Sequence, residues 1–149
     1  MHKRIFVAID SSSTSQKALD EAISLAKALG ARLCIAHAAD EGSLTQHGMG
    51  LGTYIDIDKV KDEMRESGNT LLDQAMAKAG AADCQAEKLL VESTQRRVAE
   101  MIAEAATHWN ADLIVVGTHG RRGFERLLVG SVAENLVRIA TTSLMLVRE

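Results

Sequence analysis

The chain has 149 residues, of which 46% are hydrophobic, and this length and content suit one domain with one well-formed core. Its formal net charge is −3, so it offers no basic face of the kind that nucleic-acid binding requires. No apolar run approaches the roughly 18 residues of a membrane-spanning helix, and the first residues show no secretory cleavage pattern. We therefore expect a cytoplasmic protein with neither a membrane nor a nucleic-acid partner.

The predicted elements alternate between apolar runs of strand length and amphipathic helical patterns. The first strand, Arg4–Ile9, is apolar on both faces, which is typical of a central parallel strand. In the serine-rich turn that follows, Ser13 and Gln16 have the spacing of a capping box, and the helix that begins there ends at a cap on Gly30. The second strand spans Arg32–Ala38.

The middle of the chain is less regular. Residues 39 to about 57 are polar and glycine-rich, and a connection of that length is either a functional lid or a mobile excursion. The next helix carries Gly68 on its apolar face, which we interpret as permitting close approach to the sheet; the alternative is a weak point of the helix with no such role. The third strand, Gln85–Glu92, is less apolar than the first two and therefore predicts a sheet edge.

The remaining predicted elements are a helix with its apolar stripe from Val98 to Trp109, a two-sided buried strand Asp112–Gly117, a helix from Val132 to Ala140, and a last strand Ser143–Val147. Trp109 lies on its helix's apolar stripe and is predicted to be a core residue. The order βαβαβαβαβ predicts a doubly wound α/β fold, Rossmann-like, with a five-stranded parallel sheet and helices on both faces. One domain, residues 1–149, fills the chain.

Neither the cysteines nor the histidines suggest a metal site. Cys34 and Cys84 form no C-x-x-C pair and lie in or beside strands, so we expect buried reduced thiols. His2, His47 and His108 have no ligand spacing, and no protein-built metal site is predicted.

Ligands of doubly wound sheets bind at the carboxyl ends of the strands where the winding reverses. The first and fourth strands are the most apolar and are predicted to be central neighbours, so a crevice should open between Asp10 and Gly117. Asp10 is either a ligand-facing carboxylate or a cap for the serine-rich turn. His37, at the end of the second strand, is assigned a structural role.

The loop after the fourth strand reads Gly-x-x-Gly, nine residues, then Gly-Ser, through Gly117, Gly120, Gly130 and Ser131. Glycines let backbone N–H groups converge on an anion, and the N-terminus of the following helix favours negative charge. Three arginines add positive charge: Arg121, Arg122 and Arg126. The loop is therefore predicted to bind phosphates; the alternative is that its glycines serve only the turn and its serine only the cap.

Other motifs are absent or incomplete. The loop has no P-loop lysine, and no Gly-x-Gly-x-x-Gly follows the first strand. His119 could donate to a phosphate, act as a general acid or base, or be a bystander. No nucleophile elbow or Ser-His-Asp set is present, so no catalytic residue is assigned.

Together these features resemble the universal stress protein family over the whole chain. The resemblance is carried by Val-Ala-Ile-Asp, Ala-His-Ala, Gly-Thr-His-Gly, Gly-Ser-Val-Ala-Glu and the closing Leu-Met-Leu-Val-Arg. The full glycine spacing is similar to that of the family's ATP-binding branch. Two features differ: Ser11 follows Asp10 where glycine is frequent, and Ala140–Ser143 lacks the proline that many relatives have before the last strand.

The resemblance implies a strand order of 3-2-1-4-5, a homodimer through the last strand (Ser143 to Val147), and a nucleotide site. The implied positions are Asp10 and Ala38 beside the adenine, Val116 and Gly117 near the adenine and ribose, Gly120, Gly130 and Ser131 at the phosphates, and His119, Val132 and Ala133 in the wall.

Three functional hypotheses follow. The leading one is a regulatory protein of stress adaptation that binds ATP or another adenine nucleotide, alone or with Mg²⁺. The second is a slow ATPase or autophosphorylating enzyme, against which the missing P-loop lysine and paired carboxylates argue. The third is a protein-interaction module with an empty pocket. The sequence does not choose among ATP, ADP, AMP and cyclic AMP.

Overall fold

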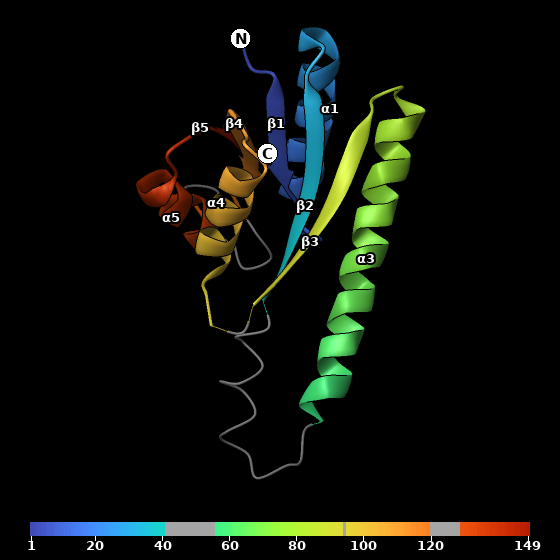
Figure 1. The fold of residues 1–149 in the computed structure, drawn as a ribbon, viewed down its shortest axis with the longest axis vertical. Coiled ribbons are helices and arrows are strands. Elements are labelled where there is room, and N and C mark those ends of the chain that lie inside the picture. Colours follow the sequence, from blue (N-terminus) through green and yellow to red (C-terminus); the bar gives the residue numbers. More distant parts are fainter. Residues whose placement is uncertain (41–55, 94, 120–128) are drawn as a thin grey trace.

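The computed structural model describes residues 1–40, 56–93, 95–119 and 129–149 (Figure 1). Five parallel strands form a sheet in the order β3-β2-β1-β4-β5. The strands are β1 (Arg4–Ala8), β2 (Arg32–Asp40), β3 (Ala86–Ser93), β4 (Leu113–Gly117) and β5 (Ser143–Val147). The helices are α1 (Ser13–Leu29), α3 (Ile57–Ala81), α4 (Val98–His108) and α5 (Ser131–Ile139). The predicted doubly wound α/β fold is confirmed.

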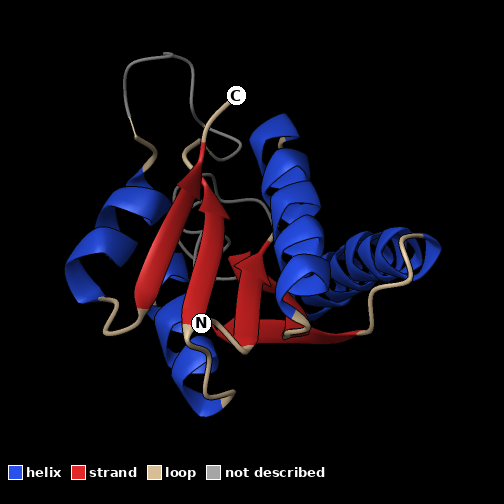
Figure 2. Cartoon of the chain, turned by 90° about the horizontal axis from the view of Figure 1, so that it is seen from above, coloured by secondary structure: helices blue, strands red, loops and turns tan. Residues whose placement is uncertain are grey.

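Helices cover both faces of the sheet (Figure 2). Ile5 and Val7 of β1 point to the face covered by α1 and α3, whereas Phe6 points to the face covered by α4 and α5. All three side chains are completely buried, because β1 lies at the centre of the sheet. The first strand is therefore apolar on both faces because both faces are buried, as the sequence predicted.

Gly68 brings α3 close to the sheet, as predicted. A Cβ at this position would lie 2.9 Å from Cδ1 of Leu90 and 3.0 Å from Cδ2 of His37. The His37 ring is held in turn by its Nδ1, 2.8 Å from the carbonyl oxygen of Ile9. A carbonyl only accepts, so Nδ1 is the donor and His37 has the structural role assigned to it.

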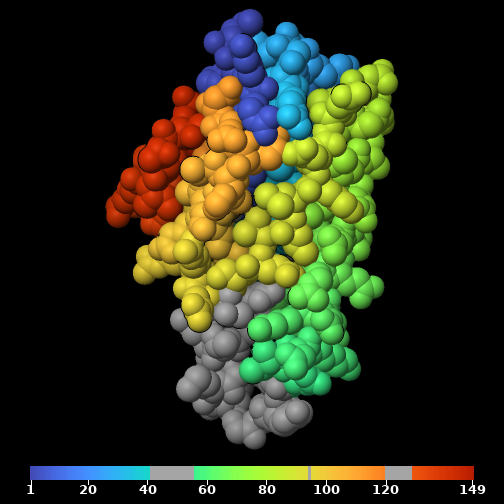
Figure 3. Space-filling model, in the orientation of Figure 1, coloured from blue at the N-terminus to red at the C-terminus, as the bar shows by residue number. Residues whose placement is uncertain are grey.

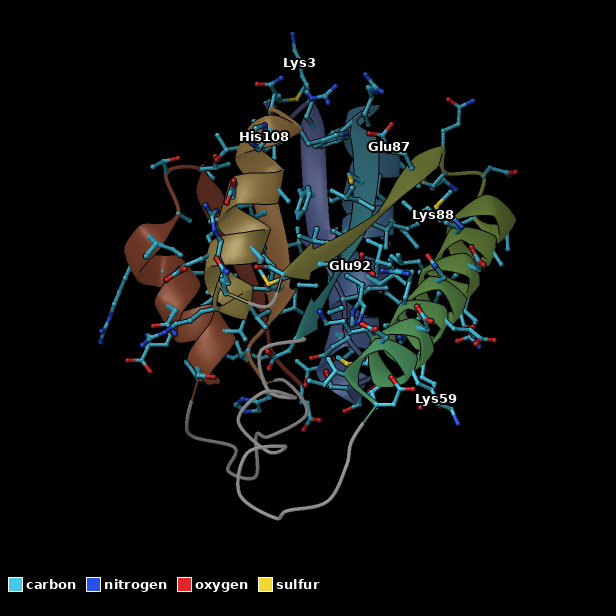
Figure 4. The ribbon with its side chains drawn as sticks, turned by 60° about the horizontal axis from the view of Figure 1, so that its bottom comes forward. Lys3, Lys59, Glu87, Lys88, Glu92 and His108 are labelled. Atoms are coloured by element: carbon cyan, nitrogen blue, oxygen red, sulfur yellow. The ribbon has the colours of Figure 1, made fainter. Side chains whose placement is uncertain are left out.

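β3 is an edge strand, as predicted, and two ion pairs join it to α3. Arg65 Nε lies 2.7 Å from Glu92 Oε1, and Lys88 Nζ lies 2.5 Å from Asp73 Oδ1. Figure 4 labels the two β3 residues of these pairs, Lys88 and Glu92. Helix α3 forms the right-hand border of the molecule in Figure 3. These side chains are partly exposed, so each pair stabilises the docking of α3 only slightly.

Three local predictions need correction. The N-cap of α1 is Ser12, whose side chain accepts from the Ser15 amide, rather than Ser13. The turn closes one residue earlier because the Ser12 amide donates to the Asp10 carboxylate at 2.7 Å. β2 runs to Asp40 rather than Ala38, because it stays paired with β3 as far as Ser93. Residues 41–55 of the long connection lie outside the described residues.

The third correction concerns Trp109, which is half-buried rather than a core residue. It is the C-cap of α4, where one side of the ring lies against Phe6 with a centroid distance of 6.3 Å. The Arg4 guanidinium lies 4.0 Å from the ring centroid, and the indole N–H donates to Glu87. The ring therefore lies at the amino-terminal edge of the sheet. It packs on the apolar Phe6 ring, while its N–H and its contact with Arg4 are polar.

The absence of a proline does not disturb the last strand. β5 pairs with β4 in parallel from Ser143 to Val147, and Ala140 ends α5 with φ −67° and ψ 133°. Both cysteines are free and buried, as predicted. Burial, with a smaller contribution from Glu87 that Arg4 partly offsets, raises the pKa of the Cys34 thiol to about 12.

Gly117 and Gly80 provide a matched test of packing. A Cβ on Gly117 would lie 2.9 Å from Thr14 Cγ2 and 3.1 Å from the backbone C and O of Thr14, which cannot move away without shifting α1. A Cβ on Gly80, inside α3, would meet nothing within 4 Å. We expect Gly117→Ala to lower the free energy of unfolding by ~1–3 kcal/mol and Gly80→Ala to raise it by up to about 1 kcal/mol. Urea denaturation measures both; equal effects would contradict this account.

The Asp112 carboxylate predicts an acid-sensitive contribution to stability. Partial burial raises its pKa, but hydrogen bonds from the amides of Lys3 (2.7 Å) and Arg4 (3.2 Å) and the nearby His2 outweigh this, and the pKa lies below the ordinary value of 3.8. The stabilisation is thus fully present above the unfolded-state pKa and disappears as the pH falls through the folded-state pKa. Wild type should unfold at higher urea concentration than Asp112→Asn at pH 6, and the difference should vanish in acid. A difference independent of pH would argue against the charged form.

Candidate functional site

The predicted crevice lies where β1 and β4 end side by side. Val7 pairs with Val115, and Ala8 pairs with Ala36, so the register carried two residues further puts Ile9 beside Gly117 and Asp10 beside Ala38. This brings Asp10, Ala38 and Gly117 together at the carboxyl edge of the sheet. From there the chain continues to α1 on one face and towards α5 on the other, which is the arrangement in which doubly wound sheets bind ligands.

Asp10 has an observed role in the turn before α1. Its Oδ1 accepts from the Ser12 amide at 2.7 Å, and its own amide donates to Ser15 Oγ at 2.7 Å. One carboxylate oxygen therefore caps the turn. The contact with a ligand that was predicted for Asp10 would use the other oxygen and remains a prediction.

The ends of the glycine-rich loop are tied together. Thr118 is 3% exposed; its amide donates to the Val147 carbonyl at 2.9 Å, and its carbonyl accepts from the Gly130 amide at 2.6 Å. The loop therefore leaves β4 and enters α5 at nearly the same point. Gly120 and the three arginines of the loop lie outside the described residues.

Within the described part of the chain, no side chain caps the N-terminus of α5. Its N-cap is Gly130, with φ −61° and ψ 157°, and the first intrahelical bond runs from the Glu134 amide to the Gly130 carbonyl at 2.9 Å. Helix geometry leaves the amides of Ser131, Val132 and Ala133 without intrahelical partners. By contrast, side chains of Ser12 and Asp56 cap α1 and α3, whereas α4 resembles α5 in this respect.

The electrostatics of this terminus favour an anion. The free amides carry the positive end of the helix dipole. Glu134 is the acidic residue of the first turn, but its carboxylate pairs with Arg138 at 3.0 Å, one turn further along the helix. The side chains of Ala133, in α5, and Val116, in β4, are buried in the core between the sheet and the helices α4 and α5. These two predicted positions can therefore offer a ligand only their backbone.

His119 contributes a buried polar atom without a partner. Its backbone carbonyl accepts from Ser12 Oγ at 3.4 Å. Its ring Nδ1 is buried and finds no hydrogen-bond partner among the described residues. A buried polar atom left without a partner costs about 1–3 kcal/mol, so this nitrogen marks a place where a further hydrogen-bonding group would be stabilising. The sequence left the role of His119 open among three alternatives.

Two residues of the site escaped the sequence-based assignment. Ser12 and Thr14, in the first turn of α1, contact the chain as it leaves β4. The serine-rich turn after Asp10 was their only signal in the sequence.

A separate cavity of about 300 Å³ lies between α4 and α5 and is lined by residues such as Thr107, Ile114 and Thr142. None of the residues assigned to the crevice lines it.

Within the described ranges, no three His, Cys, Asp or Glu side chains come together in a way that could hold a metal ion. No helix found there has the length and apolar character needed to cross a bilayer.

Comparisons with known proteins agree on one family. The sequence profile described as "Universal stress protein family" matches residues 1–148. The universal stress protein YxiE of Bacillus subtilis is 32% identical over 99% of this chain and all of its own length. A crystal structure of a universal stress protein family member from Burkholderia pseudomallei has a TM-score of 0.79 and 33% identity, covering 99% of this chain and 96% of the other. A universal stress protein solved in complex with cAMP has a TM-score of 0.70 and 29% identity, covering 98% of this chain and 97% of the other.

Proposed function

The chain belongs to the universal stress protein family, and from this premise we propose that it binds an adenine nucleotide between β1 and β4. We place this activity in the cytoplasm, as part of the regulation of stress adaptation. The observation that carries the proposal is the N-terminus of α5, which no described side chain caps and which leaves the amides of Ser131, Val132 and Ala133 at the edge of the crevice. A phosphate would supply the acceptor that these amides lack.

His119 supports the same site. Its buried, unpartnered Nδ1 belongs to the segment that leaves β4 towards α5, so a nucleotide bound there would give this atom a hydrogen-bond partner. The Ser131 hydroxyl and the glycine-spaced loop add further donors to a phosphate. We propose no catalytic residue, and the proposal requires no metal ligand from the protein.

The adenosine moiety would lie over the ends of β1 and β2. Ala38 is half-buried there, and a methyl side chain leaves room for a flat ring beside Asp10. The complex of a 29% identical relative with cAMP supports an adenine nucleotide as the class of ligand for this chain. Binding would stabilise the Gly117–Ser131 loop and alter the surface that a partner protein meets.

Gly130→Asp tests the phosphate site without damaging the fold. Gly130 has a φ that any residue adopts, and aspartate is a favourable N-cap, so stability should stay equal or rise. The new carboxylate would occupy the amides and repel a phosphate, lowering the affinity for ATP by about tenfold or more. Gly130→Asn, neutral and of the same shape, should weaken binding less. Titration calorimetry with ATP, ADP, AMP, cAMP and adenosine measures the effect.

Two outcomes of this titration would remove the proposal. One is the absence of heat with every one of these ligands, and the other is equal ATP affinity in wild type and Gly130→Asp. Phosphate release measured in the same samples tests turnover: release by wild type well above Gly130→Asp would identify an enzyme instead.

We also propose that the protein forms a homodimer through the outer edge of β5. The described chain covers this edge with no further strand, and Val137 and Ile139 of α5 are 59% and 41% exposed. Because the Val147 carbonyl accepts from Thr118, strand alternation turns the Leu146 backbone outward, where a second copy could pair with it.

Leu146→Pro removes one outward-facing N–H, whereas Leu146→Ala removes the same side chain and keeps the N–H. Proline is tolerated on the free side of an edge strand. Light scattering after gel filtration should show a dimer for wild type and for Leu146→Ala, and a monomer for Leu146→Pro. A dimeric Leu146→Pro protein, or a wild type that is monomeric at all concentrations, would exclude this interface.

A further inference from the structure

We infer that Ser12 is a positioning residue, which holds the chain leaving β4 in the conformation that receives phosphate without touching the ligand itself. The inference rests on the nucleotide site proposed above and names the contact that preorganises it. It concerns the segment from Gly117 to His119, in which each residue is held by a different part of the fold.

The Ser12 hydroxyl joins two elements. Its oxygen accepts from the Ser15 amide at 3.2 Å, which caps α1, and its proton faces the carbonyl oxygen of His119 at 3.4 Å. A hydroxyl has one donor and two acceptor positions, so both contacts coexist. The Asp10 carboxylate fixes the Ser12 amide at 2.7 Å, so the hydroxyl sits on a rigid turn.

Packing holds the same segment from the side. Thr14 is 1% exposed and lies so close to Gly117 that no Cβ fits between them. Ser15, which accepts from the Asp10 amide, is 3% exposed. The first turn of α1 is thus a buried, hydrogen-bonded surface, and the start of the loop lies directly against it.

The residue between these contacts transmits the constraint to α5. The Thr118 amide is held by Val147 and its carbonyl by the Gly130 amide. The His119 carbonyl belongs to the peptide that follows the Thr118 carbonyl. Displacing it would therefore disturb the Thr118 carbonyl, which accepts from the Gly130 amide at the N-cap of α5. The free amides of α5 and the His119 ring would lose their fixed relation, and the affinity for phosphate would fall.

The test compares three variants of the same turn. Ser12→Gly removes the hydroxyl but leaves an acceptable N-cap, so the cost in stability is much smaller than the usual effect of losing a cap. Ser12→Thr keeps the hydroxyl and therefore both of its contacts. Ser13→Ala is the matched control, because the Ser13 hydroxyl donates to Glu149 at 2.9 Å and not to the His119 carbonyl.

The first readout is the ratio of ATP to adenosine affinity, measured by titration calorimetry. A lost positioning contact should lower this ratio about three- to tenfold in Ser12→Gly, with no change in Ser12→Thr or Ser13→Ala. A general loss of structure would weaken both ligands alike. An unchanged ratio in Ser12→Gly overturns the inference and leaves the nucleotide site intact.

The second readout needs no ligand. Hydrogen exchange of the Thr118 and Gly130 amides should accelerate about three- to tenfold in Ser12→Gly relative to that of Phe6 in the core, and should not change in Ser13→Ala. If wild type binds no nucleotide, the proposed function fails, and exchange alone decides whether Ser12 holds the loop. Unchanged exchange would then overturn that anchoring role as well.

Discussion

β1 and β4 are neighbours in the sheet, but the chain leaves them on opposite faces, and this reversal determines where the polar groups of the site lie. Parallel strands bring their carboxyl ends to one edge, so the turns after β1 and β4 start side by side. Because α1 and α5 lie on opposite faces of the sheet, the helix that follows one strand does not cover the turn that follows the other. The first turn of α1 and the first turn of α5 consequently lie at the same edge of the sheet, although more than a hundred residues separate them in the chain.

The two helix starts at this crevice are built differently. α1 begins within a closed set of hydrogen bonds among Asp10, Ser12 and Ser15, so its own side chains satisfy the terminus. α5 begins at a glycine, and no side chain of the described residues caps its first amides. The chain leaving β4 contacts both termini, through Ser12 and Thr14 at α1 and through Gly130 at α5. The backbone amides at the start of α5 would attract an anion, which supports the phosphate binding proposed above.

Much of the fold was predictable because its determinants are local. The apolar pattern of Arg4–Ile9 reports burial on both faces, and Gly68 on a helix face reports a close approach that His37 and Leu90 confirm. The spacing of Gly117, Gly130 and Ser131 marks the loop by residue type alone. What the sequence could not specify depends on tertiary contacts. Several serines offer similar capping spacing, and the choice of Ser12 is made by the Asp10 carboxylate. The apolar stripe of α4 could not reveal that Trp109 lies where the sheet ends. The roles of Asp10 and His119 stay unassigned by sequence for the same reason, since they depend on which partners the fold leaves free.

The bond between the Gly130 amide and the Thr118 carbonyl has a consequence for how this protein can vary. This bond fixes the end of β4 to the start of α5 by a contact that does not run through residues 119–129. The entropy of closing such a segment grows only logarithmically, by about 0.6 kcal/mol for each doubling. Changes in the number of residues between His119 and Gly130 should therefore cost little stability. In the proposed nucleotide site such changes would alter the ligand preference while selection on folding acts elsewhere, which leaves this segment open to evolutionary change.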